Sequence, residues 1–165
     1  MGDGMNEDVP AALPVLSFTS TIVGRSLRLV NSATVKHGND SLTVDAQWDT
    51  GASNTCIAME VAQALRLPVT GMAMMKTPSG MREMPTFVVD LLLPNNVTVT
   101  NLVVMGSEIG GQGIGVLVGM DVITFGDFAV SFKDGLTRFS FRIPSIEHAD
   151  FVGISNTKTN GPGVS

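Results

Sequence analysis

The chain has few of the residues that supply covalent, metal or aromatic stabilisation. Its 165 residues include one Cys, two His, one Trp and no Tyr, and aromatic residues make up 5% of the total. A single cysteine excludes a disulfide within the chain, and His37 and His148 alone form no cluster with zinc-ligand spacing. We therefore expect neither a structural metal nor a cofactor.

Clustered positive charge and long apolar runs are also missing. The formal net charge is −5, and the Lys and Arg residues form no run of the kind that binds phosphate backbones. No apolar stretch is long enough to cross a bilayer. The segment from Met1 to Phe18 is acidic where a secretory signal is basic, and Asn6 stands where myristoylation needs Ser or Thr. We expect a soluble cytoplasmic protein that binds neither nucleic acid nor membrane.

What the chain does contain favours short strands and tight turns. There are 18 Gly and 8 Pro, and 44% of the residues are hydrophobic. This composition predicts a mainly β protein with one core. Proline and polar residues near the two ends predict one domain over residues 17–146, between a flexible N-terminal segment 1–16 and a flexible tail 147–165.

Hydrophobic periodicity places the main elements. Ser26 to Val35 and Ser41 to Trp48 alternate apolar and polar residues around a turn, so they predict a hairpin that leads directly to Asp49. Ala58 to Leu67 carries the one helical pattern. Apolar runs on both sides of Pro78-Ser79-Gly80 predict a projecting hairpin. Further strands are expected at Val97 to Met105, Val116 to Val118, Phe128 to Phe132 and Thr137 to Ile143.

The tetrapeptide Asp49-Thr50-Gly51-Ala52 carries the chemistry. It joins an acid, a hydroxyl and a glycine directly after a strand, where the backbone turns sharply and its N–H groups can face a carboxylate. Hydrogen bonds of this kind shift the pKa of the acid. The alternative is an ordinary strand-ending turn, since Asp and Gly are favoured turn residues.

The order of elements decides between these interpretations. After the motif come a short helix, the projecting hairpin and then Leu117-Val118-Gly119-Met120-Asp121. This order, from Ser26 to Ile143, resembles the retropepsin family of retroviral, retrotransposon and bacterial aspartic peptidases. The resemblance implies an acid-protease β-barrel with one short helix after the catalytic loop, active as a symmetric homodimer, and leaves a viral or mobile-element source open. Trp48 departs from the family, because a smaller aliphatic residue usually precedes the aspartate.

The resemblance also implies roles for individual residues. Asp49 would be the general acid and base, Thr50 would brace the two loops across the dimer axis, and Gly51 would place a backbone N–H near the carboxylates. The residues that would contact substrate are Ala52, Ser53 and Asn54 in the catalytic loop, Ser79, Gly80 and Met81 at the flap tip, and Ile114 in a side-chain pocket.

Catalysis of this type needs two carboxylates that share one proton. The chain has one Asp-Thr-Gly, and Asp121 and Asp127 lack the residues that follow it. The second carboxylate must therefore come from Asp49 of another copy. We expect hydrolysis of peptide bonds beside hydrophobic residues at mildly acidic to near-neutral pH. The apolar face of Phe139 to Ile143, with Phe141 at its centre, is the predicted dimer contact.

Other interpretations remain. The main alternative is a retropepsin-like module that dimerises or binds peptides without cleaving them. A serine hydrolase built on Ser53 and His148 is disfavoured because Thr55 breaks the nucleophile motif. Glycines 110–115 lack the helix and the Lys-Ser/Thr of a phosphate-binding loop. Cys56 is predicted to be a small buried hydrophobe. The methionines between Met72 and Met84 form either a pliable recognition surface or part of the core, and we expect them to fill the core.

Overall fold

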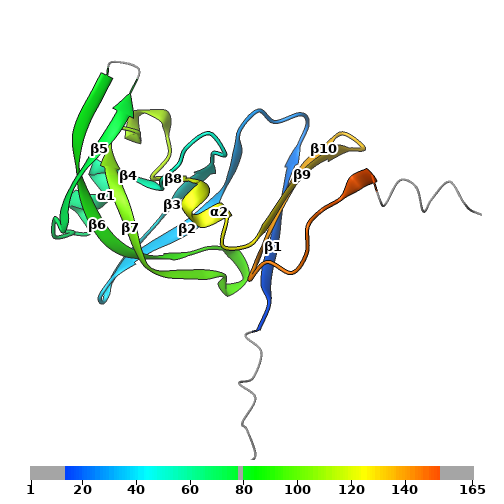
Figure 1. Cartoon of the computed structure of the whole chain (residues 1–165), viewed down its shortest axis with the longest axis horizontal. Coiled ribbons are helices and arrows are strands. Elements are labelled where there is room, and N and C mark those ends of the chain that lie inside the picture. The colour runs from blue at the N-terminus through cyan, green and yellow to red at the C-terminus, as the bar shows by residue number, and fades with distance from the viewer. Residues whose placement is uncertain (1–13, 78–79, 153–165) are drawn as a thin grey trace, which may run out of the picture.

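The computed structural model describes residues 14–77 and 80–152, and these residues are mainly β (Figure 1). The strands are β1 (Leu16–Val23), β2 (Leu29–His37), β3 (Asp40–Trp48), β4 (Cys56–Ala58), β5 (Gly71–Thr77), β6 (Gly80–Leu92), β7 (Thr98–Ser107), β8 (Val116–Val118), β9 (Asp127–Lys133) and β10 (Leu136–Ile143). The helices are α1 (Met59–Ala64) and α2 (Met120–Ile123), with 3-10 turns η1 (Pro94–Asn96) and η2 (Gly110–Gln112). Parts of the predicted flexible ends, 1–13 and 153–165, lie outside the described residues.

Six strands close into a barrel. Their order is β2-β3-β8-β4-β7-β6, and β6 pairs again with β2 through Thr34↔Leu92 and Lys36↔Asp90. The barrel can close because β6 is long. Its first half pairs with β5, and its last residues pair with β2. The β5–β6 hairpin therefore extends beyond the barrel wall (Figure 1), as the turn at Pro78-Ser79-Gly80 predicts.

The short strand β8 lies between β3 and β4. It is parallel to β3, with Trp48 opposite Val118, and antiparallel to β4, with Cys56 opposite Leu117. The loop from Asp49 to Thr55 connects these two flanking strands, so it must pass over the end of β8. Strand periodicity predicts β8 itself but says nothing about which strands are its neighbours.

A second sheet of three strands, β1-β10-β9, lies beside the barrel (Figure 1). It joins the barrel through an aromatic cluster, which we define as Phe18, Trp48, Phe128, Phe139 and Phe141. Trp48 comes from the barrel and stacks on Phe128 with ring centroids 5.1 Å apart and planes 9° apart. Because each of these rings buries a large apolar area, the cluster ties the end of β3 to all three strands of the second sheet.

This arrangement corrects the predicted dimer contact. β10 is the central strand of its sheet, with β1 on one edge and β9 on the other. The side chains of Phe139 and Phe141 are 0% exposed inside a single chain. The strand does bury an apolar face, but it buries that face within its own protomer, so the dimer role predicted for Phe141 is wrong.

The helices are shorter than the sequence pattern suggests. α1 spans Met59–Ala64 instead of Ala58 to Leu67, because Arg66 adopts a left-handed conformation with φ 49° that ends the helix before Pro68. Val61, Ala62 and Leu65 are buried and Met59 is partly buried, so the helix packs its apolar residues against the core. The short helix α2 and strand β1 were not predicted, although Leu16, Phe18 and Ile22 share one face of β1.

Phe141→Ala should lower the free energy of unfolding by about 3–5 kcal/mol, because it leaves a cavity in the aromatic cluster. Urea denaturation followed by the fluorescence of Trp48, the only tryptophan, measures this change. Phe125→Ala is the control, since Phe125 is 50% exposed and its removal should cost below about 1 kcal/mol. Equal losses for the two variants would contradict the core role of Phe141.

Candidate active site

Asp49 begins the loop that passes over β8, and hydrogen bonds hold it in two directions. Its backbone N–H donates to the carbonyl of Val118 at 2.9 Å, which joins it to β8. Its carboxylate oxygen Oδ1 accepts a bond from the N–H of Gly51 at 2.8 Å. A Cβ at position 51 would lie 3.1 Å from that oxygen, which is tight, so glycine suits the position. Asp49 is half-buried, which leaves part of its surface open to a reactant.

The far end of the loop is held by what we call the Thr55–Asp121 clamp. Thr55 is fully buried, and both its N–H and its hydroxyl donate to the carboxylate of Asp121, at 2.9 and 2.7 Å. The same hydroxyl accepts the N–H of Gly119 at 3.1 Å. Hydrogen bonds to a carboxylate are stronger than neutral ones, so the clamp anchors the loop to the start of α2.

Gly119 is required by a close backbone approach. A Cβ at this position would lie 2.6 Å from the carbonyl carbon of Asn54 and 2.7 Å from its oxygen. Two further bonds cross the same contact, from the N–H of Met120 to the carbonyl of Ala52 at 2.8 Å and from that of Asp121 to Ser53 at 3.2 Å. The residues Leu117-Val118-Gly119 therefore occur together because β8 must end directly beneath the Asp49 loop.

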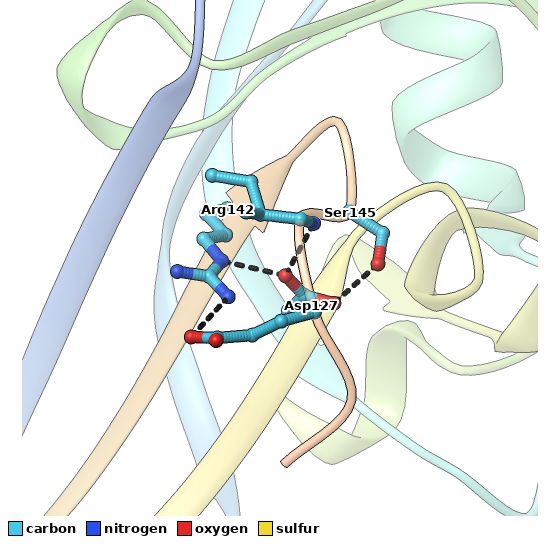
Figure 2. Close-up of polar contacts among 5 residues, drawn as sticks. Asp127, Arg142 and Ser145 are labelled. Carbon is cyan, nitrogen blue, oxygen red and sulfur yellow. Dashed lines mark hydrogen bonds and ion pairs between the residues drawn. The ribbon is translucent and has the colours of Figure 1, made fainter.

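The carboxylates of Asp121 and Asp127 are engaged in other contacts. Asp121 has both carboxylate oxygens in the clamp. Asp127 lies in the second sheet, where Arg142 Nε donates to it at 2.5 Å and Ser145 and the N–H of Ile146 also donate (Figure 2). These hydrogen bonds hold the pKa of Asp127 below its usual range. The bond from the backbone of Ile146 has the largest effect, followed by those from Ser145 and Arg142. Neither acid is a second copy of the Asp49 arrangement.

The predicted substrate contacts in this loop lie at its surface. Thr50, Gly51, Ser53 and Asn54 are exposed, and Ala52 is half-buried. In the β5–β6 hairpin Gly80 has φ 115° and Met81 is 59% exposed, while Ser79 lies outside the described residues.

Ile114 differs from these surface residues. It is 3% exposed and borders a cavity of about 360 Å³ whose lining includes Arg28, Asp45 and Gly113. Arg28 donates to Gln47 and to the carbonyl of Gln112, which connects the glycine-rich loop to β3.

Three methionines of the hairpin contradict the prediction that they fill the core. Met72, Met74 and Met81 are 54%, 58% and 59% exposed. Met72 pairs with Pro85 and Met74 with Glu83, so all three side chains lie on the hairpin face that carries Pro85. Exposed methionines on one face form a pliable apolar surface. Of the two interpretations of this Met-rich segment, the recognition surface agrees better with the structure.

Two residues beside the motif also have defined places. Trp48 is 4% exposed, and its Nε1–H donates to Asn31 Oδ1 at 2.6 Å, so its bulk lies in the aromatic cluster. Leu117 is half-buried between the buried residues Val116 and Val118. Because alternate residues of a strand face opposite sides, its side chain points away from the barrel core. The sequence alone does not show that Leu117 is more exposed than Val116 and Val118, because all three residues are apolar.

The competing nucleophiles lack the geometry they need. Cys56 is buried, and burial, with a smaller effect from Asp121, raises its pKa to about 11. It therefore stays a protonated thiol at neutral pH. Its burial confirms the predicted small buried hydrophobe. Ser53 has no hydrogen bond to His37 or His148 in the structure. The glycine-rich loop runs into β8 and not into a helix.

Within the described ranges, no three His, Cys, Asp or Glu side chains gather as metal ligands. Among these same residues, every helix is too short or too polar to span a membrane.

Comparisons with known proteins address the family and the fold of the chain. The sequence model of the aspartyl protease family matches residues 32–122. A retropepsin-like aspartic protease from Rickettsia conorii superposes with a TM-score of 0.53 and 16% identity, over 79% of this chain and 97% of that one. No curated protein sequence matches the chain.

Two viral proteases align less well. The simian foamy virus protease gives a TM-score of 0.43 at 17% identity over 58% of this chain and 91% of that one. The EIAV protease, solved with the inhibitor HBY-793, gives a TM-score of 0.46 at 15% identity, over 61% of this chain and 91% of that one. The match to the Rickettsia protein carries the assignment of a retropepsin-like fold.

Thr55→Val should lower the free energy of unfolding by about 1–3 kcal/mol, because it leaves Asp121 and the N–H of Gly119 without the hydroxyl. Thr55→Ser keeps the hydroxyl and should lose less. Urea denaturation of both variants tests the clamp. A Thr55→Val protein as stable as the parent would show that the clamp does not hold the loop.

Proposed function

Since the chain belongs to the aspartyl protease family, we propose that it is a retropepsin-like endopeptidase in which Asp49 from each of two copies forms the catalytic pair. The observation that carries the proposal is the Asp49 loop itself. It is anchored at both ends, to β8 and through the Thr55–Asp121 clamp, while the Asp49 carboxylate stays partly accessible.

The chemistry follows from two carboxyl groups that share one proton. One carboxylate takes a proton from water, and the water oxygen attacks the peptide carbonyl carbon while the other carboxyl protonates the carbonyl oxygen. The tetrahedral intermediate then collapses. Its C–N bond breaks as the carboxyl that took the water proton gives it to the nitrogen, while the other carboxylate takes a proton from one hydroxyl of the intermediate, so the products are an amine and a carboxylic acid. Each Asp49 thus acts once as acid and once as base.

The remaining candidate residues would position the substrate. Thr50 would brace the two loops across the twofold axis, and Gly51 would present its N–H near the carboxylates. Ala52, Ser53 and Asn54 would follow the peptide backbone, Ser79, Gly80 and Met81 would close over it, and Ile114 would border a side-chain pocket. The exposed face of Met72, Met74 and Met81 supports a preference for hydrophobic residues at the cleavage site.

Strand β9 is our candidate surface for dimerisation. It pairs with β10 on one edge, and no described strand covers its other edge. Val130 is 50% and Phe132 is 55% exposed, on the face that carries Phe128 and the aromatic cluster. An uncovered edge with apolar side chains favours pairing with another chain. The cluster contains Trp48, so this surface is connected directly to the residue before Asp49.

Asp49→Asn should lower the rate of peptide cleavage at least about a thousandfold, because an amide cannot share a proton with the second carboxylate. Folding and dimerisation should stay unchanged, because the side chain keeps its size. Digestion of a peptide library at several pH values, with mass spectrometric detection, measures the effect. Cleavage by the purified variant at the parent rate would end the proposal. A parent protein that binds peptides but cleaves none would favour the non-catalytic module.

Phe132→Arg should give a folded, inactive monomer, because charge on the β9 edge opposes pairing without entering the core. Analytical ultracentrifugation measures the mass and Trp48 fluorescence confirms the fold. Val23→Arg is the matched control, since Val23 is 88% exposed on β1, the other outer strand of the sheet. An unchanged dimer in Phe132→Arg would place the interface elsewhere.

A further inference from the structure

We infer that a groove on the outer wall of the barrel, beside Asn54, is a second contact site for the polypeptide substrate and takes an uncharged, apolar segment outside the scissile residues. This inference rests on the proposed peptidase function. We call the site the outer groove. Its volume is about 440 Å³, and its lining includes Asn54, Met74, Thr86, Val103, Asp121 and Phe125.

The outer groove runs along the side of β7 whose side chains point away from the barrel core. On β7, Leu102 and Val104 are buried, whereas Val103 between them is 56% exposed. Across the sheet, Val103 pairs with Val88 and Met105 pairs with Thr86, so these residues share the outer face. Phe125 follows α2 and is 50% exposed. Large apolar side chains that remain half exposed around one hollow mark a contact surface.

The position of the groove identifies its occupant. Asn54 belongs both to the groove and to the loop that would follow the substrate backbone, and Met74 belongs to the hairpin that would close over it. A substrate that leaves the cleft along Asn54 therefore enters the groove directly. Because Asn54 belongs to both places, one extended peptide would contact the Asp49 loop and the groove in turn.

The charge and polarity of the lining residues indicate which peptide side chains the groove would bind. Asp121 is the one charged side chain among the lining residues, and its carboxylate oxygens are held by Thr55 and Val122. The other polar side chains are amides and hydroxyls, on Asn54, Thr86, Thr100 and Asn101. Neutral hydrogen-bonding groups beside Val103, Met74 and Phe125 suit a peptide backbone with apolar side chains and select no charge.

The test compares one cleavage site in a long and in a short substrate. The probes are the oxidised B chain of insulin and a short synthetic peptide that spans its cleavage site. Val103→Lys and Phe125→Ser should lower kcat/KM for the long probe about tenfold, as expected for loss of a buried apolar contact, and leave the short probe unchanged. Val69→Lys is the matched control, because Val69 is 59% exposed and lies outside the groove.

Each outcome separates the groove from the peptidase proposal. Equal kcat/KM for parent and groove variants on the long probe, or equal losses on both probes, would overturn the groove while the peptidase stands. A shift of Val103→Lys to monomer in analytical ultracentrifugation would make the groove a subunit contact and also overturn the inference. If the parent cleaves neither probe nor a peptide library, the peptidase proposal fails first and the groove inference falls with it.

Discussion

The structure depends on the insertion of β8 between β3 and β4. Because these two strands are consecutive in the chain but are separated in space by a third, the residues between them must cross the end of that third strand. The crossing brings the Asp49 loop against Gly119 and α2, where backbone bonds and the Thr55–Asp121 clamp hold it. A loop held at both ends can present a carboxylate in one fixed geometry, which acid–base catalysis requires.

The aromatic cluster extends this constraint to the second sheet. Trp48 precedes Asp49 directly and packs against aromatic rings from β1, β9 and β10. Its size, unusual at this position for the family that the sequence resembles, fills the space between barrel and sheet. The Asp49 loop therefore rests on the aromatic interior of its own chain. Any partner that pairs along β9 would act on Asp49 through this rigid connection.

Sequence patterns predict most of the individual elements because they depend on local physics. Alternation around residues 36–40 indicates the first hairpin, Pro78-Ser79-Gly80 indicates the projecting one, and the buried character of Cys56 follows from its apolar neighbours. The failures have a common cause. Phe141 and the exposed methionines have the hydrophobicity that was expected, but hydrophobicity alone does not tell which surface covers a side chain. That depends on neighbours that are distant in the chain.

The sequence by itself determined the mainly β fold class and the single Asp-Thr-Gly motif, because these follow from residue types and their spacing. Only the tertiary structure decided that Asp121 clamps Thr55, that Phe139 and Phe141 belong to the core, and that Val103 and Phe125 border a groove beside Asn54. These facts concern contacts between strands far apart in the chain. They are set by barrel closure and by the position of β8, which no local pattern encodes.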